Sequence, residues 1–270
     1  MKKLSLLTLC IAAVLPTMAT AATVKGHVDE KIVGNLMPGM DVVLTHKDQA
    51  SGLNMVRLAS SEIFFTNDEA SFIIGGQSIG MFTPDNNGIK DVSTPVNETF
   101  NKKIIDELVG DTGILLKAEN EEFVVTAFVD PACGYCQKMH SEIDSYLDAG
   151  ISIRFAAFPI FGDKSKAALE SVMSEKEPTK AVESLLESEQ LIKRSDNFDE
   201  FYDKLNTASD EGKGVVAKHT EAAKMLGMRG TPGLVLKSGK VIPSYIPASD
   251  LKAYLKQQEQ AAEPQSQSAK

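Results

Sequence analysis

Residues 123–140 read FVVTAFVDPACGYCQKMH. The first seven are apolar or β-branched, which is typical of a strand buried on both faces in a parallel sheet. Asp130-Pro131 then favours a turn, and a helix is predicted from Cys136 to Leu147 because apolar residues recur there at helical spacing. A strand that leads through a Cys-x-x-Cys motif into a helix predicts a redox-active α/β domain.

Cys133 and Cys136 are the residues expected to carry the chemistry, and Gly134 and Tyr135 separate them. The start of a helix offers free N–H groups and a positive partial charge, which stabilise a thiolate. Cys133 is therefore the expected nucleophile. Cys136 lies one helical turn later, where it can attack a mixed disulfide and leave a Cys133–Cys136 disulfide.

Other uses of the two cysteines are weaker. A tetrahedral zinc site needs further ligands, and His140 offers at most a third. Attachment of haem would require His directly after Cys136, where Gln137 stands. A structural disulfide in so small a loop would constrain the unfolded chain little. The sequence therefore predicts no metal and no cofactor.

Pro232 is the second informative position, because Thr231-Pro232 directly precedes a short apolar strand. One interpretation is a cis peptide beside the cysteines, with free backbone groups that bind an extended substrate peptide. The other is an ordinary proline at the start of a strand. For His140, a solvated surface position is preferred over a role in shifting a thiol pKa.

The chain has 270 residues, of which 43% are hydrophobic and 24% charged, and this composition is globular. The excess of 37 acidic over 28 basic residues argues against nucleic acid as a partner. Three cysteines are too few for a disulfide-dense scaffold.

The first residues have the pattern of a secretory signal peptide over residues 1–21. Lys2 and Lys3 precede an apolar run from Leu4 to Leu15, and Ala19-Thr20-Ala21 offers a cleavage site. The run is too short to span a membrane and ends at Pro16. Removal would take Cys10 with it and leave Cys133 and Cys136 as the thiols of an exported, soluble chain.

Short strands with turn residues between them indicate a small antiparallel sheet after the signal. The expected strands are 42–44, 55–58, 63–66, 72–74 and 78–82. Asn97 is expected to cap a helix with Phe100, Ile104, Ile105 and Leu108 on one face, ending at Gly110. This helix can connect two domains.

The remaining pattern is α/β. Residues 151–158 are a second buried strand, helical segments follow to Met228, and 234–242 form a hairpin. The predicted organisation is a domain at 22–83, a linker with a helix at 84–118 and an α/β domain at 119–258. A helical insertion occupies about 163–228 of the last domain, and 259–270 form a disordered tail.

Several segments together resemble the DsbC/DsbG family of bacterial periplasmic thiol:disulfide isomerases. They are residues 123–140, Phe155 to Pro159, Gly230 to Leu236, Gly39 to Leu44 and Thr94 to Asn97. The resemblance covers nearly the whole chain after the signal. The Gly134-Tyr135 dipeptide, the Thr231-Pro232 loop and the upstream β domain make it more specific than the Cys-x-x-Cys motif alone.

The resemblance implies a thioredoxin-like catalytic domain with a helical insertion, joined by a linker helix to a small N-terminal α+β (cystatin-like) dimerisation domain. It implies a homodimer with a shared apolar cleft for misfolded or mis-oxidised exported proteins, and chaperone activity. A membrane reductase like DsbD would keep the cysteines reduced. Thr231, Pro232, Gly134 and Tyr135 would contact substrate, and Thr231-Pro232 would be the cis-proline loop.

Three departures from related proteins stand out. A second, structural cysteine pair is absent, and Gly233 follows the proline where alanine is more familiar, which would loosen the loop. In thioredoxin a buried acid stands on this strand and can take part in proton transfer. The corresponding position here is Ala127, so that acid is absent.

The main functional hypothesis is therefore a periplasmic protein disulfide isomerase. One alternative is a DsbG-like reductase of sulfenylated cysteines, although DsbG-like proteins usually carry Pro-Tyr between the cysteines. Another is a holdase chaperone that does no redox work.

Overall fold

The computed structural model describes residues 24–36, 39–75, 80–85, 88–194, 205 and 208–262. The predicted signal at 1–21 and residues 263–270 of the predicted tail lie outside these residues. Residues 259–262 were expected to be disordered, but they belong to the helix Ala248–Ala262. Among the described residues, no helix is long and apolar enough to cross a bilayer.

The N-terminal unit is a four-stranded antiparallel sheet in the order β1-β2-β3-β4 with one short helix. Its elements are α1 (Glu30–Asn35), β1 (Val42–Lys47), β2 (Asn54–Leu58), β3 (Ile63–Thr66) and β4 (Ile74–Gly75). The helix packs on one face, where Ile32 and Leu36 meet Val56 and Phe64.

The first three strands lie where the sequence places them, but the fourth does not. Pairing begins at Ile74 rather than Phe72, so β4 is a two-residue strand. The strand expected at 78–82 falls partly outside the described residues. Its last residue begins β5 (Phe82–Asp85), which forms a separate hairpin with β6 (Gly88–Asp91).

The linker helix α2 (Ser93–Leu108) begins four residues before the expected cap. The Asp91 carboxylate accepts hydrogen bonds from the backbone N–H groups of Ser93 and Thr94. These bonds satisfy N–H groups at the start of the helix, which therefore begins before Asn97. The predicted cap at Asn97 is therefore wrong, whereas the apolar face with Phe100 and Ile104 is buried as expected.

The second unit is built on a sheet of five strands in the order β11-β10-β8-β9-β7, called the α/β sheet below. They are β7 (Ile114–Leu116), β8 (Phe123–Val129), β9 (Ile151–Ala157), β10 (Gly233–Leu236) and β11 (Val241–Ile242). The central β8 runs parallel to β9 and antiparallel to β10, and β10 and β11 form the expected hairpin.

The structure moves the expected start of this domain. Ile114 and Leu116, placed in the linker by sequence, pair through β7 with Phe155 and Ile153 of β9. The three-residue run was too short to be recognised as a strand without its partner. The domain therefore begins by Ile114 rather than at 119.

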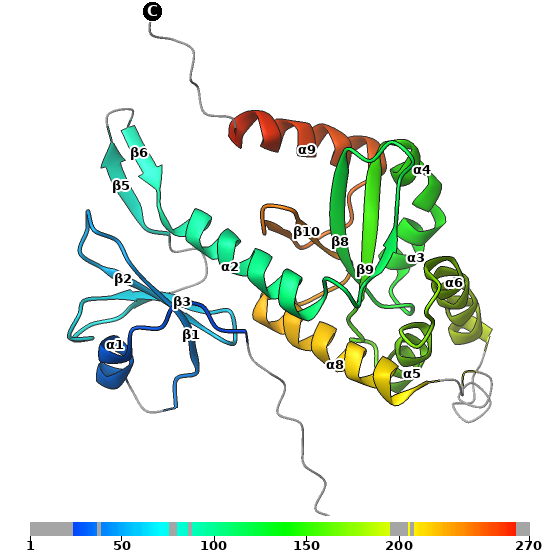
Figure 1. Cartoon of the computed structure of the whole chain (residues 1–270), viewed down its shortest axis with the longest axis horizontal. Coiled ribbons are helices and arrows are strands. Elements are labelled where there is room, and N and C mark those ends of the chain that lie inside the picture. The colour runs from blue at the N-terminus through cyan, green and yellow to red at the C-terminus, as the bar shows by residue number, and fades with distance from the viewer. Residues whose placement is uncertain are drawn as a thin grey trace, which may run out of the picture.

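Helices cover both faces of the five-stranded α/β sheet (Figure 1). They are α3 (Gly134–Ser141), α4 (Ile143–Asp148), α5 (Asp163–Val172), α6 (Pro178–Arg194), α8 (Asp210–Met225) and α9 (Ala248–Ala262). The helix expected from Cys136 to Leu147 is two helices that meet at Glu142. The three helices α5, α6 and α8 occupy the predicted insertion at 163–228.

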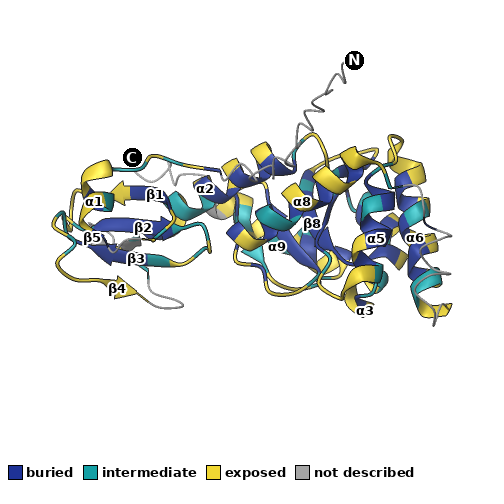
Figure 2. Ribbon diagram, turned by 90° about the horizontal axis from the view of Figure 1, so that it is seen from below, coloured by how far each residue is buried: buried dark blue, intermediate teal, exposed yellow. Residues whose placement is uncertain are grey.

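The two units share one hydrophobic core. Val43 and Met55 of the N-terminal sheet belong to the same cluster as Ile104 of α2, Met225 of α8 and Val235 of β10. In Figure 2, α2 lies between the N-terminal sheet and the part of the chain that contains α8 and β8. The N-terminal sheet is too small to bury a large core alone, and it buries apolar side chains against the unit that contains the α/β sheet.

Arg57 of β2 connects the N-terminal sheet to α2 and α8 through hydrogen bonds. It is 2% exposed, and its guanidinium donates to Asn101 Oδ1 at 2.8 Å, to the Met225 carbonyl at 2.5 Å and to Asn97. It also lies 5.0 Å from the centroid of the Phe100 ring. Burial without a carboxylate lowers the pKa of Arg57 to about 10.

We expect Arg57→Met to reduce the free energy of unfolding by about 3 kcal/mol, because three acceptors on α2 and α8, two of them buried, lose their donor. Urea denaturation measures the change. Lys47→Met, which removes a half-exposed ion pair with Asp68 on the same sheet, should change it little. Equal stability of the parent and Arg57→Met would contradict this account of the interface.

Candidate active site

Cys133 lies where β8 ends and α3 begins. It is the residue before the first helical position, and its carbonyl accepts from Gln137 N–H at 3.0 Å. Cys133 is 6% exposed and Cys136 is fully buried, and both are free thiols. The Cys133 sulfur therefore faces the free N–H groups of the first turn of α3.

The two thiols have opposite proton affinities. The pKa of Cys133 is lowered to about 5, chiefly by a hydrogen bond from the Cys136 thiol. Burial opposes this shift, and the N–H groups of Tyr135 and Cys136 reinforce it. The pKa of Cys136 is raised, first by burial and then by its hydrogen bond to Cys133. At neutral pH Cys133 is a thiolate and Cys136 a thiol.

The Thr231–Pro232 loop closes the other side of the site. Its peptide bond is cis, and the Cys133 sulfur lies 3.1 Å from the Thr231 carbonyl oxygen. The sheet brings these segments together because β8 and β10 pair directly, with Phe128 opposite Gly233.

Gly233 leaves room for a neighbouring side chain beside the loop. It is buried as the first residue of β10, and a Cβ there would lie 2.7 Å from the Met228 sulfur. The Met228 side chain therefore occupies the space that an alanine methyl would take.

The Asp130 carboxylate organises the loops around Cys133. It is fully buried and accepts from Ala132 N–H at 2.8 Å and from the Ser165 hydroxyl at 2.7 Å. Its other oxygen accepts from the N–H groups of Ile160 and Phe161 at 2.7 and 3.0 Å. The side chains of Ile160 and Phe161 are exposed beside the cysteine loop.

Tyr135 and Tyr245 form an aromatic pair at the opening of the site. Tyr135 is 65% exposed, and its ring stacks on Tyr245 with centroids 6.1 Å apart. Lys138 Nζ lies 4.8 Å from the Tyr245 centroid, and the Tyr245 hydroxyl donates to Glu142. Sequence reasoning identified Tyr135 but missed Tyr245, which reaches α3 only through the fold.

His140 is buried, so the preferred surface position is wrong. It is 3% exposed, and its Nδ1 bonds to Glu189 of α6. The error arose because the sequence shows α3 without the insertion helix that covers it. Among the described residues, no group of three or more His, Cys, Asp or Glu is placed to hold a metal ion.

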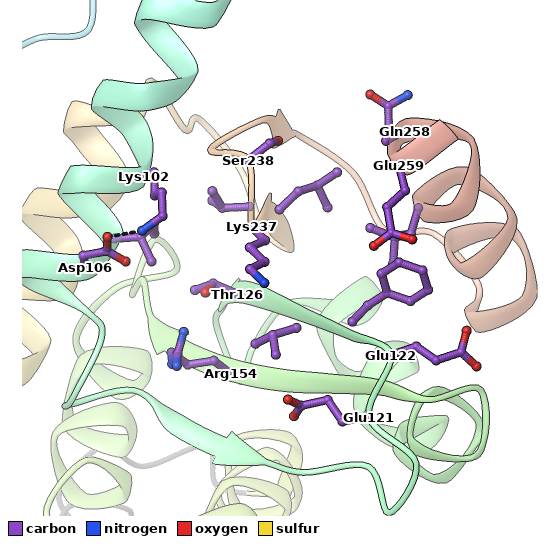
Figure 3. Close-up of a pocket in the computed structure, with 16 residues that line it drawn as sticks. Lys102, Asp106, Glu121, Glu122, Thr126, Arg154, Lys237, Ser238, Gln258 and Glu259 are labelled. Atoms are coloured by element: carbon purple, nitrogen blue, oxygen red, sulfur yellow. Dashed lines mark hydrogen bonds and ion pairs between the residues drawn. The ribbon is translucent and has the colours of Figure 1, made fainter. Parts of the chain in front are cut away.

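A groove of about 560 Å³ lies at the other end of the catalytic strands (Figure 3). Val124 and Thr126 lie in it, from the half of β8 remote from Cys133, with Lys102 and Asp106 of α2 at one side. Gln258 and Glu259 of α9 lie at the opposite side. The groove is therefore separate from the thiol pair.

Comparison with known proteins identifies the family of this chain. A family described as "Thioredoxin-like domain" matches residues 113–259. DsbC of Escherichia coli K12 is 30% identical over 204 residues, which cover 73% of this chain and 75% of that protein. DsbC of Haemophilus influenzae is 28% identical over 256 residues, covering 93% and 96%. The catalytic domain of Proteus mirabilis ScsC, a solved structure, has a TM-score of 0.49 at 20% identity and covers 58% of this chain and 97% of its own.

The fold and the paired thiols define a thioredoxin-like dithiol protein. Within that class, the chain belongs to the DsbC family of thiol:disulfide interchange proteins.

We expect the thiolate absorbance at 240 nm to rise with a midpoint near pH 5 in the reduced protein, because the folded state holds Cys133 as a thiolate. Cys136→Ala should raise this midpoint, since it removes the largest cause of the lowered pKa. Cys133→Ala should abolish the transition. A midpoint that Cys136→Ala leaves unmoved would contradict the hydrogen bond between the thiols as its cause.

Proposed function

We propose that this protein is a periplasmic protein disulfide isomerase that acts through Cys133 and Cys136. The observation that carries the proposal is the asymmetry of the pair, a stabilised thiolate at the start of α3 beside a buried thiol. Membership of the DsbC family supports the same activity.

The chemistry needs two thiol exchanges. The Cys133 thiolate attacks one sulfur of a substrate disulfide and forms a mixed disulfide, while the other substrate sulfur leaves as a thiolate. That thiolate or another in the substrate can then attack the mixed disulfide, which rearranges the pairing and regenerates Cys133. Alternatively, Cys136 attacks Cys133, forms the Cys133–Cys136 disulfide and releases reduced substrate.

The surroundings of Cys133 favour a polypeptide substrate. Gly134 and Tyr135 are exposed, and a Cβ at Gly134 would meet no atom within 4 Å, so a chain can approach closely there. Tyr135, Ile160 and Phe161 offer exposed apolar surface beside the thiol. We assign Thr231, Pro232, Gly134 and Tyr135 to substrate binding, with extended chain running along the Thr231–Pro232 loop.

The compartment follows from the signal-like residues 1–21, which direct export of the chain. Its partners there are misfolded or mis-oxidised exported proteins. Because reshuffling needs Cys133 reduced in an oxidising compartment, we include a membrane thiol reductase of the DsbD type as the electron donor.

We further propose a homodimer formed through the N-terminal sheet. The edge strand β4 and the two residues before it are apolar and exposed. Ile74 lies on β4 and is 46% exposed, and Phe72 and Ile73 precede it with 42% and 44%. An exposed apolar sheet edge is a template for pairing with another chain. Two copies paired edge to edge through a two-fold axis would place two catalytic units around one substrate.

Reactivation of scrambled ribonuclease by the reduced protein tests the proposal. We expect Ile74→Lys to give a monomer by light scattering and to lower reactivation by about tenfold or more, because two linked sites hold a substrate better than one. Leu186→Lys, which places the same charge at an exposed leucine of α6, is the control and should leave both unchanged. Weak reactivation by the parent protein would overturn the isomerase function.

A double variant, Cys133→Ala with Cys136→Ala, separates isomerase from holdase. Reactivation of scrambled ribonuclease should vanish, because both exchange steps need these sulfurs. Suppression of aggregation of a disulfide-free unfolded protein should persist, since the apolar surfaces remain. Retained reactivation in this variant would contradict the assigned chemistry.

A further inference from the structure

His140 and Glu189 form a buried pair that the exchange steps above leave without a role. Their side chains are 0% and 5% exposed, and they join α3 to α6 through a bond between Nδ1 and Oε1. The imidazole also meets the Phe155 ring of β9 edge-on, with centroids 5.1 Å apart. A charged or polar pair so deep in the domain is costly unless it has full partners.

One atom of this pair has no partner. His140 Nε2 is buried without a hydrogen bond. The other unpartnered buried side-chain atoms among the described residues belong to Asn54, Arg57, Arg154 and Thr231, and none of them is an imidazole. By contrast, the buried His219 uses both nitrogens, with Thr112 and with the Ala157 N–H.

The residue that carries this free nitrogen lies on the same face of α3 as Cys136. His140 follows Cys136 by four residues on α3, and both are buried. Residues four apart on a helix are neighbours, and helical side chains tilt toward the N-terminus. This tilt directs the His140 ring back toward the turn that contains Cys136.

Cys136 needs a proton acceptor, because only its thiolate can attack the mixed disulfide. Its full burial denies it ready access to water. On β8, Ala127 offers no acid, and both oxygens of Asp130 already accept hydrogen bonds. The Tyr146 hydroxyl is engaged with the Ile246 carbonyl at 2.6 Å.

We propose that His140, supported by Glu189, accepts the proton of Cys136 when Cys136 resolves the mixed disulfide. The proton moves to Nε2, and the Cys136 sulfur forms a bond with Cys133. The bond from Cys133 to the substrate breaks, and its electron pair leaves on the substrate thiolate. The Glu189 carboxylate balances the imidazolium that results.

The groups around the ring limit what else could act there. Among the contacts described above, Glu189 on α6 is the titratable side chain that touches the ring, and β9 contributes the apolar Phe155. Cys136 lies one helical turn before His140 on α3. His140 is therefore in contact with one buried carboxylate and one turn away from the resolving thiol. The inference rests on the proposed dithiol function and concerns its second step alone.

Stopped-flow reaction of the full-length reduced protein with an aromatic disulfide reagent separates the two steps. Attack by Cys133 releases one equivalent of aromatic thiol at a rate proportional to reagent concentration. Resolution by Cys136 releases the second at a rate independent of it, and Cys136→Ala must remove that phase.

The test variant is His140→Phe with Glu189→Leu, which replaces the whole pair by apolar side chains and leaves no charge unpaired. We expect the second phase to slow by about tenfold or more, because general base catalysis is lost, while the first phase stays within about twofold. Glu189→Gln, which retains a hydrogen-bond partner for Nδ1, should slow the second phase less.

His46→Phe, at an exposed position on β1, is the control and should change neither phase. An unchanged second phase in the folded double variant would overturn the proposal. Equal slowing of both phases would also overturn it, because a merely structural pair would disturb the whole site. Failure of ribonuclease reactivation with both phases intact would overturn the isomerase function and leave this inference standing.

Discussion

Direct pairing of β8 with both β9 and β10 is the constraint on which the site depends. The parallel register with β9 and the antiparallel register with β10 fix the end of β8 in space. Cys133 follows that end, and Thr231–Pro232 precedes the residue of β10 that faces Phe128. Two segments 98 residues apart thereby meet at one sulfur, 3.1 Å from a carbonyl. A slip in either register would separate thiol and loop.

The different surroundings of the two thiols give them different roles. The free N–H groups at the start of α3 and the Cys136 thiol stabilise negative charge on Cys133, whereas the core below α3 opposes charge on Cys136. A second hydrophobic cluster, which does not include the two cysteines, runs from β10 and α8 past α2 into the N-terminal sheet, where Arg57 ties β2 to α8. The catalytic unit and the N-terminal unit are thus packed against each other through this second cluster.

The parts of this fold that the sequence predicted depend on local signals. The thiol pair, β8 and the β10–β11 hairpin lie in short segments whose periodicity and turn residues are sufficient. The errors came from distant partners. Asn97 resembled a cap, but Asp91 accepts the hydrogen bonds at the start of the helix, and Asn97 accepts one from Arg57 of strand β2. β7 is recognisable only beside β9, and His140 seemed a surface residue until Glu189 of α6 covered it.

The high proton affinity of Cys136 has a consequence for the choice between rearrangement and reduction. An isomerase must keep its mixed disulfide long enough for another substrate thiolate to attack it. A buried Cys136 that stays protonated slows its own attack and lengthens that interval. Resolution must nevertheless occur when no rearrangement succeeds, which requires somewhere for the proton to go. A base that is held by a carboxylate on the insertion helix, rather than free in solvent, would set this delay from within the fold.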